Sequence, residues 1–417
     1  MTGTATAVKP RLTSPLGLTE AVSCELDGAV RLTTPAEDAA AHRRRFGAAP
    51  TLSRGALTDL VAQAALTGRG GAHFPVARKW RTIAASEGPA VVVANAAESE
   101  PASAKDAVLL QRFPHLVLDG LAACARELGA DTTIVWLHEG DDATLAALRQ
   151  AQTERQASGT VEPRAQFVTG PARYLTGESS ALLSGLNGGA VLPTFRRVPA
   201  ARSGFDGRPT AIHNVETLAR VALLARERPA AGGLFTVVTR RRTVIETSGA
   251  DTFAEVLARA GVSWAPTAVL LGGYGGSWVP WQRLAHTPAD PAGADIGAGV
   301  LIPLATRHCG LATTAAIATY LAEQSARQCG PCRFGLPELA RQVSRLARGG
   351  RHTTSAVTEL SGLVGEVTGR GGCSHPDGAT SLVVTAMRVF APDITSHRDH
   401  RRCLGSGEAA HLPGIGR

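Results

Sequence analysis

The sequence is poor in aromatic residues and has no long hydrophobic run. Only 4% of its 417 residues are aromatic, whereas 44% are apolar and 46 are glycine. It contains no uncharged apolar stretch of about eighteen residues, and residues 1–18 include no signal-like hydrophobic segment. We therefore expect a cytoplasmic globular protein, built mainly from small aliphatic residues, that does not itself insert into a membrane.

Positive charge is spread along the whole chain and is not confined to one region. The formal net charge is +8, with local arginine clusters at residues 43–45, 196–197 and 240–242. No basic stretch is interleaved with aromatic residues, which argues against binding to nucleic acid. We interpret the clusters mainly as solvated surface, although a basic face would also attract an acidic ferredoxin-like partner.

The seven cysteines are an odd number, and three of them lie in one late stretch. Cys329 and Cys332 are separated by Gly330-Pro331, and Cys373 follows in a glycine-rich segment. Two thiolates at this spacing can share one metal centre. The pattern fits metal ligation in a reducing compartment better than disulfide bonds.

A second motif lies near the N-terminus, in Gly68-Arg69-Gly70-Gly71-Ala72-His73-Phe74-Pro75. Small residues around an arginine allow backbone N–H groups to approach a phosphate or a ring carbonyl, while the cation offsets negative charge. The loop suits a phosphate-bearing flavin, and the cysteines suit an iron–sulfur cluster. Together they indicate an electron-transfer flavoprotein.

The length exceeds the ~250–300 residues at which single cores usually stop growing, so several domains are expected. Strands predicted at 90–94 and 132–137 alternate with helices at 58–66, 115–128 and 144–156, which favours an α/β domain with a largely parallel sheet. Short strands from about 234 to 280 predict a β-grasp-like module, and the region after 311 is helical. The predicted division is an N-terminal arm (1–50), an α/β domain (51–230), the middle module (231–305), a helical cysteine-bearing domain (306–392) and a tail (393–417).

Several motifs, in this order, resemble the flavin-binding subunit of the NADH dehydrogenase module of respiratory complex I, found also in NAD-linked hydrogenases and formate dehydrogenases. The resemblance spans about residues 40–395. Besides the glycine loop with Lys79-Trp80, it rests on residues 95–101 (NAAESEP) with Lys105-Asp106, on Gly177-Glu178, and on residues 207–217 (GRPTAIHNVET). It implies an FMN-binding α/β domain, a soluble-ligand-binding β-grasp module and a helical bundle that carries a [4Fe-4S] cluster.

The resemblance also implies site residues and partners. Around FMN it places Gly68, Arg69, Gly70, Gly71, Lys79, Asn95, Glu98, Gly177, His213, Asn214 and Thr217. Glu98, Glu178 and His73 are the expected catalytic residues. The expected partner is an iron–sulfur protein, either a thioredoxin-like [2Fe-2S] subunit or a ferredoxin, within a hetero-oligomer.

One departure from the family concerns the cluster. The family has Cys-x-x-Cys-x-x-Cys and a distant fourth cysteine, whereas Ala326 occupies the first position here. Cys329, Cys332 and Cys373 remain, so a [4Fe-4S] cluster with another ligand, a [3Fe-4S] cluster or no cluster are the alternatives. Cys309, Cys403 and His375 are candidates for the fourth bond, and His375 is preferred because it lies two residues from Cys373.

A second set of departures falls where the family receives NADH. An acid of the family is replaced by Ala97, another by Ser179, and a phenylalanine by Val198. A valine cannot stack on an adenine, and a serine lacks the carboxylate acceptor. His73 replaces a family glycine; its imidazole would fill the nicotinamide position, donate a proton to reduced flavin, or face solvent.

These observations support two hypotheses. The first is an FMN-dependent oxidoreductase that passes electrons between the flavin and iron–sulfur centres, with NADH or a ferredoxin-type protein as the partner redox couple. The second is a non-catalytic assembly subunit that keeps the fold after losing NADH oxidation. The retained polar residues, Arg69, Lys79, Asn95, Glu98 and Asn214, argue against the second, because a scaffold does not require them.

Overall fold

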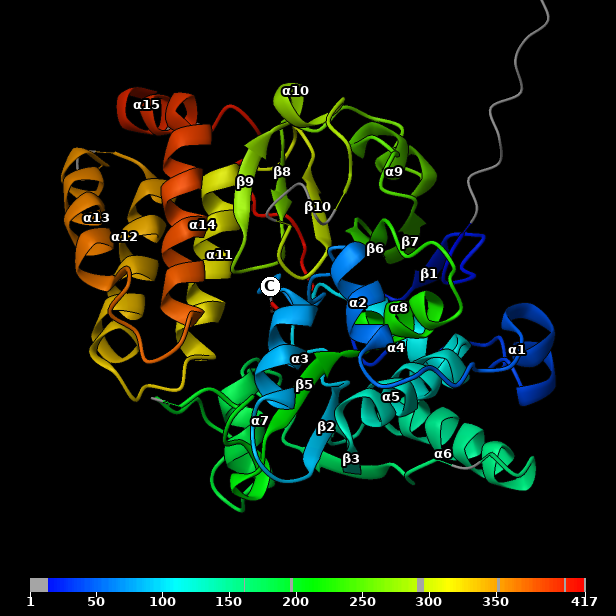
Figure 1. Cartoon of the computed structure of the whole chain (residues 1–417). Helices are drawn as coiled ribbons and strands as arrows, with labels where there is room; N and C mark the ends of the chain where they lie inside the picture. The colour runs from blue at the N-terminus through cyan, green and yellow to red at the C-terminus, as the bar shows by residue number, and fades with distance from the viewer. Residues whose placement is uncertain are drawn as a thin grey trace, which may run out of the picture.

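The computed structural model describes residues 14–160, 162–195, 198–290, 296–350, 353–400 and 403–415. Figure 1 shows an α/β part below, a β-sheet part above it and a group of helices to the left. The predicted fold class, α/β followed by C-terminal helices, is confirmed. The arginine pair at 196–197 lies outside the described residues. No described helix has the length and apolar character needed to cross a membrane.

The α/β part is built on a four-stranded parallel sheet in the order β4-β3-β2-β5. Its strands are β2 (Ala90–Asn95), β3 (Ala130–His138), β4 (Gln166–Gly170) and β5 (Thr210–Asn214). The first five residues of β2 are buried, as expected for a strand covered on both faces by helices. Because all four strands run in one direction, their carboxyl ends meet at one edge, where ligands of such sheets bind.

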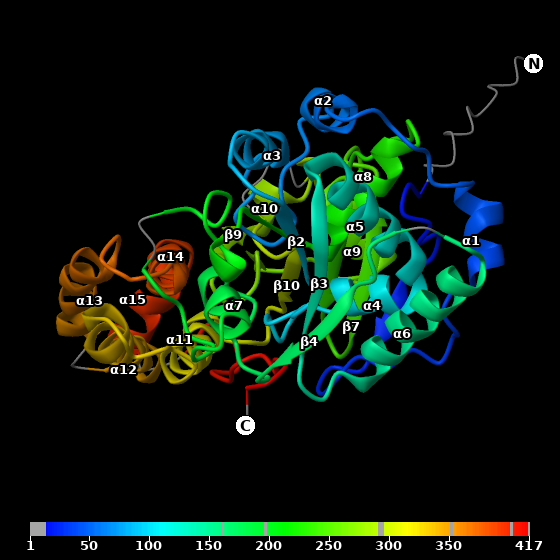
Figure 2. The same ribbon diagram turned by 60° about the horizontal axis from the view of Figure 1, so that its bottom comes forward.

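Helices cover this sheet and bring the binding loops to its edge (Figure 2). They are α2 (Ala56–Gln63), α3 (Val76–Ala84), α4 (Lys105–Arg112), α5 (Pro114–Leu128), α6 (Asp142–Ala157), α7 (Ser179–Leu186) and α8 (Val215–Ala225), and a 3₁₀ turn η1 (Phe205–Gly207) precedes β5. The helices α5 and α8 approach closely at Gly120, where an added Cβ would lie 1.8 Å from the Leu218 carbonyl oxygen. Only glycine fits at this crossing.

The middle part contains a six-stranded mixed sheet in the order β1-β7-β6-β10-β8-β9. Its strands are β1 (Val22–Cys24), β6 (Gly233–Val238), β7 (Arg242–Thr247), β8 (Ala268–Leu271), β9 (Ser277–Pro280) and β10 (Val300–Leu304). Only β6 and β10 pair in parallel. The helices α9 (Phe253–Arg259) and α10 (Trp281–Leu284) accompany it.

The C-terminal part is helical and packs beside β9 (Figure 1). It contains α11 (Gly310–Glu323), a π-helical turn η2 (Pro331–Gly335), α12 (Leu336–Arg348), α13 (Thr353–Val367), α14 (His375–Val389) and α15 (Ala391–His400). The helices α11 and α14 are antiparallel: His375, at the start of α14, bonds the carbonyl of Leu321 near the end of α11, whereas Phe390, just after α14, packs against Gly310. Cysteines at opposite ends of these helices are therefore far apart.

Among the described residues, the segments near both ends of the chain contain more secondary structure than the sequence predicts. The N-terminal arm contributes β1 to the middle sheet, and α1 (Ala39–Phe46) begins at an Asp38 cap. Residues beyond 393 continue as α15 to His400, where an irregular tail was expected. The segment after 403 then returns to the middle part, where the Tyr274 hydroxyl donates to the Pro413 carbonyl at 2.5 Å.

Candidate active site

A cavity of about 500 Å³ opens at the carboxyl edge of the parallel sheet, where the three parts of the molecule meet. From the α/β part it is lined by the glycine loop, by residues of the 95–106 segment, by the 174–179 turn and by Asn214. The middle part adds Gly272, Gly275, Gly297 and Ala298, and the helical part adds Ser374, His375 and Gly378. The cavity thus joins motifs that are about 300 residues apart in the chain.

The glycine loop forms one wall of this cavity. Arg69 donates its backbone N–H to the Thr217 hydroxyl at 2.9 Å, which ties the loop to α8. Gly71 has φ +100°, and an added Cβ there would touch Gly297 across the cavity, at 3.7 Å. The 3.7 Å approach is ordinary van der Waals contact, so it is the left-handed backbone at Gly71 that favours glycine here.

The Arg69 side chain is a buried cation whose donors are not all used. It is 6% exposed, and its Nε and Nη1 have no hydrogen-bond partner among the described residues. Burial, together with the nearby Arg220, lowers its pKa to about 10. A buried cation with unused donors at a glycine cradle fits the phosphate or a ring carbonyl of FMN.

Two asparagines mark the ends of adjacent strands. Asn95 of β2 and Asn214 of β5 are register partners at the cavity edge. The Asn95 amide donates to the Gly177 carbonyl at 2.8 Å and the Asn214 amide donates to Asp106 at 2.5 Å, so both are held in place. Lys105 lies between Asp106 (2.7 Å) and Glu216 (3.2 Å). This buried network fixes the polar floor of the cavity.

Glu98 and Glu178 both accept backbone N–H groups at helix N-termini. Glu98 accepts from Asp106 and Ala107 at the start of α4, at 3.0 and 3.1 Å. Glu178 caps α7 by accepting from Ser180 and Ala181, each at 2.9 Å. Both residues line the cavity, and these bonds fix the orientation of their carboxyl groups there.

Glu100 is a cavity residue that was not among the predicted site residues. Its carboxyl accepts from the Tyr274 N–H at 2.9 Å and lies 3.3 Å from the Tyr174 hydroxyl. Burial raises its pKa to about 7, although these hydrogen bonds oppose the shift. A carboxyl that titrates near neutrality beside the cavity is suited to proton transfer.

The structure turns some predicted site residues away from the cavity. Lys79 donates to the Ile212 carbonyl at 2.7 Å, and burial lowers its pKa to about 8. His213 accepts from the Trp80 indole at 2.8 Å, and burial keeps its pKa well below the usual value. Gly68 and Thr217 do not line the cavity: the Gly68 N–H donates to the Phe74 carbonyl at 3.0 Å within the glycine loop, and the Thr217 hydroxyl accepts from Arg69. Lys79 and His213 therefore position α3 against β5.

Of the positions where the sequence departs from the family's NADH contacts, two line the cavity and one lies on the exposed segment after α7. Ala97 and Ser179 line the cavity, where neither offers a carboxylate. Val198 is 48% exposed and Phe195 is 79% exposed, on the segment after α7. His73 is half-buried with φ +45°, a backbone conformation that glycine adopts freely. The loop therefore has a glycine-like backbone at the position where the family has glycine.

Cys329, Cys332 and Cys373 are brought together beside the cavity. Burial and the neighbouring Cys329 raise the pKa of Cys332 to about 12, and Cys373 adds to this effect. Burial would also raise the pKa of Cys329, but backbone N–H groups of Gly372 and Cys332 outweigh it and leave the pKa below its usual value. Three sulfurs whose charges repel each other, each supplied with at least one backbone N–H donor, fit an iron–sulfur cluster.

The arrangement of the helices reduces the number of candidates for the fourth cluster ligand. Cys309 precedes α11, and Cys403 lies close to it. The cluster cysteines lie beyond the other end of α11, ~20 Å away given its 14 residues at about 1.5 Å each. Cys309 and Cys403 cannot supply the fourth bond. His375 remains a prediction: its Nε2 donates to the Leu321 carbonyl at 2.8 Å, so only Nδ1 is available for a metal.

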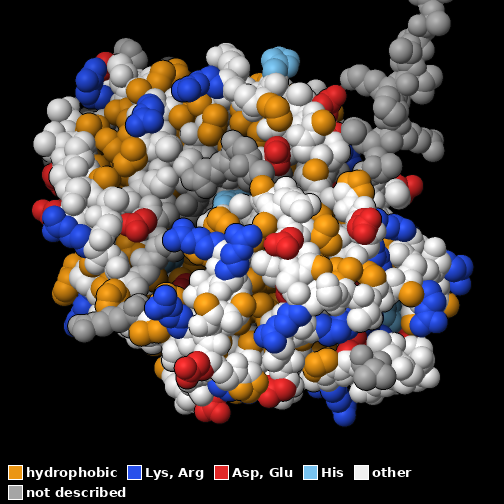
Figure 3. Space-filling model, viewed as in Figure 1, with side chains coloured by type: hydrophobic (Ala, Val, Ile, Leu, Met, Phe, Trp, Pro, Cys, Tyr) orange, Lys and Arg blue, Asp and Glu red, His pale blue; other side chains and the backbone are white. Residues whose placement is uncertain are grey.

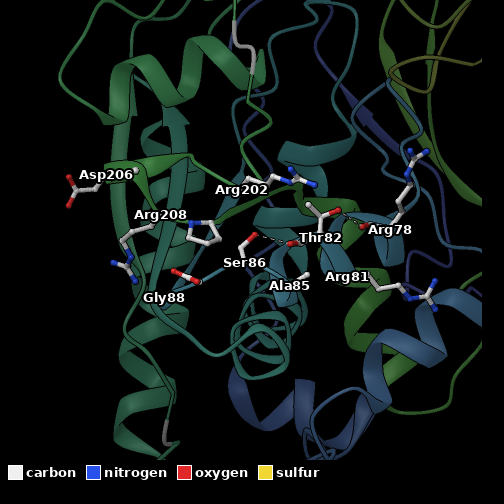
Figure 4. A pocket seen from close by; sticks show the side chains of 12 residues that line it. Arg78, Arg81, Thr82, Ala85, Ser86, Gly88, Arg202, Asp206 and Arg208 are labelled. Atoms are coloured by element: carbon white, nitrogen blue, oxygen red, sulfur yellow. Dashed lines mark hydrogen bonds between the residues drawn. The ribbon is translucent and has the colours of Figure 1, made fainter.

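A second, more open pocket of about 1020 Å³ lies on the outer side of α3. Its lining includes four arginines, Arg78, Arg81, Arg202 and Arg208, and the polar groups of Thr82 and Ser86 (Figure 4). Figure 3 shows Lys and Arg side chains gathered around the middle of the same face as Figure 1. The pocket shares no lining residue with the cavity, and its charge suits an acidic partner surface better than redox chemistry.

The contribution of the middle part to the cavity was not predicted. Gly272, Gly275 and Gly297 reach the cavity, and Gly272 has φ +95° with Gly297 packed against it. Residues 272–276 (GGYGG) could have indicated that this segment lines the cavity. Dense glycines often mark a place where the backbone closely approaches a ligand.

Comparisons with known proteins agree with this geometry. The family described as the Nuo51 FMN-binding domain matches residues 61–223, and the NADH-ubiquinone oxidoreductase-F iron-sulfur binding region matches residues 312–397. An NADH-quinone oxidoreductase subunit of Rhizobium meliloti is 26% identical over 83% of this chain and 90% of its own length. The corresponding NADH-quinone oxidoreductase subunit of Streptomyces coelicolor is 27% identical over 83% of this chain and 84% of its own.

Comparison with solved structures also finds a similar fold. An NAD⁺-reducing [NiFe]-hydrogenase in the H₂-reduced state matches with a TM-score of 0.75 and 26% identity. The match covers 89% of this chain, but the chain spans only 66% of that hydrogenase chain. Both matched regions occur here in order, so the chain contains an FMN-binding domain of the Nuo51 family followed by an NADH-ubiquinone oxidoreductase-F iron-sulfur binding region.

Proposed function

We propose that this chain is an oxidoreductase subunit that passes electrons between NADH, FMN bound in the cavity, and an iron–sulfur cluster held by Cys329, Cys332 and Cys373. The observation that carries the proposal is the contact between the two sites. Ser374, His375 and Gly378 line the cavity, and Cys373 directly precedes them. Because electron transfer slows steeply with distance, this adjacency favours a direct path.

FMN, when bound, supplies the conversion between two-electron and one-electron transfer. The chain's own residues bind and orient it. Arg69 offers buried positive charge, Asn95 and Asn214 offer fixed amides at the strand ends, and the glycines of three loops leave room for a flat ring. Glu100, with a pKa near neutrality, holds or releases a proton at the cavity wall.

NADH is the proposed two-electron partner because the relatives are named for it, although this chain lacks three of the family's contacts, at Ala97, Ser179 and Val198. We expect weak dinucleotide binding rather than none, since the glycine loop, Glu98 and Glu178 remain. A thioredoxin-like [2Fe-2S] subunit or a ferredoxin is the proposed protein partner, within a hetero-oligomer. The arginine-lined pocket of Figure 4 is the surface that would face an acidic partner.

The test is an anaerobic titration of the purified protein, followed by visible absorption and low-temperature EPR. Bleaching of the flavin by NADH with a new cluster signal is the expected result. A flavin that stays oxidised with NADH but is reduced by dithionite would mean that electrons enter from another protein. A colourless protein that binds neither added FMN nor iron would support the non-catalytic assembly role. In Cys373→Ser the flavin should still bleach, and the cluster signal should be lost.

A further inference from the structure

A second group of metal-binding side chains lies at the far end of the helical part. The ligand atoms of Cys309, His397 and Cys403 all lie within 4.8 Å of one another. Cys309 is 0% exposed, His397 is 3% exposed and Cys403 is partly buried. They come from the start of α11, from α15 and from the segment that follows α15. Such a convergence of soft donors from three separate segments is typical of a structural metal site.

The first two side chains are oriented as ligands. The Cys309 sulfur caps α11 by accepting the Ala312 N–H at 3.4 Å, which fixes the sulfur at the helix N-terminus. His397 donates its Nδ1–H to the Leu346 carbonyl at 3.0 Å, because a carbonyl can only accept. Its Nε2 therefore presents a lone pair, 3.9 Å from the Cys309 sulfur. An imidazole anchored through one nitrogen to a carbonyl is the usual setting of a metal-binding histidine.

Cys403 is held in the same way and lies near a fourth donor. Its sulfur accepts the Gly405 N–H at 3.4 Å and lies 3.9 Å from a carboxylate oxygen of Asp393. Asp393 precedes His397 by one helical turn, so both side chains leave the same face of α15. Zinc bonds of ~2.3 Å to sulfur and ~2.0 Å to nitrogen separate the two ligand atoms by about 3.5 Å. The observed 3.9 Å requires only a small inward movement.

We propose that Cys309, His397 and Cys403 bind a Zn²⁺ ion, with Asp393 or a water molecule as the fourth ligand. Two thiolates and an imidazole match the ligand preference of Zn²⁺, and Asp393 or a water molecule completes the tetrahedral coordination. The site is separate from the iron–sulfur cluster, because the length of α11 lies between them.

The ion would fasten the C-terminal segment to the helical part. After Cys403 this segment pairs with the start of α11, where the Cys309 N–H donates to the Glu408 carbonyl at 2.8 Å and the Ala410 N–H donates to the Thr313 hydroxyl at 3.0 Å. Farther on, the Pro413 carbonyl receives the hydroxyl of Tyr274, whose backbone N–H bonds Glu100 in the cavity wall. Through these contacts the bound metal would stabilise the part of the cavity wall that contains Tyr274 and Glu100.

The test is the metal content of the full chain, purified under reducing conditions and without a metal-affinity column. After addition of Zn²⁺ and removal of loosely bound ion, about one tightly held zinc per chain is expected, besides iron. Cys403→Ser and His397→Gln each remove a direct ligand, so zinc affinity should fall by more than the about 10–100-fold that loss of an outer-shell partner causes, while the iron content is unchanged. Cys373→Ser is the matched control, because it should lower iron and leave zinc in place.

Substitution by Co²⁺ in the unmodified chain gives a test that does not depend on how the variants fold. Intense charge-transfer bands and tetrahedral d–d bands are expected from two thiolate ligands. A chain that holds no zinc at saturating Zn²⁺ overturns the proposal. So does a mass 2 Da below that of the reduced chain with a mapped Cys309–Cys403 bond, because the pair would then be a disulfide.

Discussion

The Glu100 carboxyl and the Tyr174 hydroxyl lie 3.3 Å apart in the wall of the cavity, against the helical part that holds the cysteines. Burial raises the pKa of Glu100 to about 7 and raises the pKa of Tyr174 well above its usual value. The tyrosine therefore stays a hydrogen-bond donor while the carboxyl changes charge near neutrality. This pair therefore makes its wall of the cavity sensitive to pH near neutrality.

The raised pKa of Glu100 predicts the sign of a stability change. Its native pKa, about 7, exceeds the unfolded value of 4.5, so the native state binds the proton more tightly. The resulting stability is fully present below pH ~4.5 and is lost as the pH rises through about 7. We expect wild-type protein to lose roughly 2–3 kcal/mol more than Glu100→Gln between pH 5 and 8, measured by denaturant unfolding. Glu139→Gln, at an exposed site, should keep the wild-type slope.

Replacing Arg69 with Met should separate its contribution to FMN binding from its effect on the stability of the protein. Loss of a charge-assisted bond of about 1.5–3 kcal/mol predicts an FMN dissociation constant raised ~10–100-fold. Riboflavin, which lacks the phosphate, should be affected much less if Arg69 contacts the phosphate. Removal of an incompletely bonded buried cation should not destabilise the apo-protein.

The control for Arg69 is Arg81→Met, on the outward face of the same region, in the pocket of Figure 4. Fluorescence titration of the apo-protein measures both affinities. Equal losses of FMN and riboflavin affinity in Arg69→Met would place the arginine at the flavin ring and not at the phosphate.

The missing cluster cysteine is tested by Ala326→Cys. Arg327 has φ +54°, and its backbone donates towards the Cys332 sulfur, so residue 326 directly adjoins the cysteine group. We expect more iron per chain and slower loss of the cluster in air. Ser325→Cys is the control, since the Ser325 hydroxyl turns back to the Ala322 carbonyl at 2.8 Å. Unchanged iron in Ala326→Cys would mean that another group already completes the site.

The parts of the fold that were predictable are those with one dominant local signal. The continuous apolar run of β2 is buried on both faces, and the glycine loop lies at the edge of its sheet as the motif order implied. The Cys329–Cys332 pair with its Gly330-Pro331 spacer predicted a shared centre with Cys373, and the three cysteines do lie together.

Other features depend on contacts that no local pattern encodes. The three residues of β1 join β7 across about 220 positions, and the polar helix α15 is held by His397, whose ring bonds Leu346. Sequence motifs also do not give side-chain direction. Lys79 and His213 belong to the family pattern, yet they bond Ile212 and Trp80 away from the cavity, because burying their polar atoms required partners there.

Two helical glycines provide a matched test of packing. At Gly120 in α5, an added Cβ would overlap the Leu218 carbonyl, so Gly120→Ala must push α5 and α8 apart. We expect a loss of roughly 3 kcal/mol or more in the free energy of unfolding. Gly362 in α13 is exposed with no atom near its Cβ position, and Gly362→Ala should gain about 0.5–1 kcal/mol from helix propensity. Equal effects at both sites would contradict the close crossing of α5 and α8.

His73 can be tested by separating its ring from its backbone. Its φ of +45° costs an L-residue about 1 kcal/mol that glycine does not pay, so His73→Gly should stabilise the protein relative to His73→Ala by about that amount. Both variants lose the imidazole. If the ring fills the nicotinamide position, both should be reduced by NADH faster than wild type, in stopped-flow traces at 450 nm. If the ring instead donates a proton to reduced flavin, both should be slower. Both ring nitrogens of His73 are buried, so a solvent-facing ring is excluded. Unchanged rates in both variants would show that the ring takes no part in flavin reduction, and the stability difference would then be its only consequence.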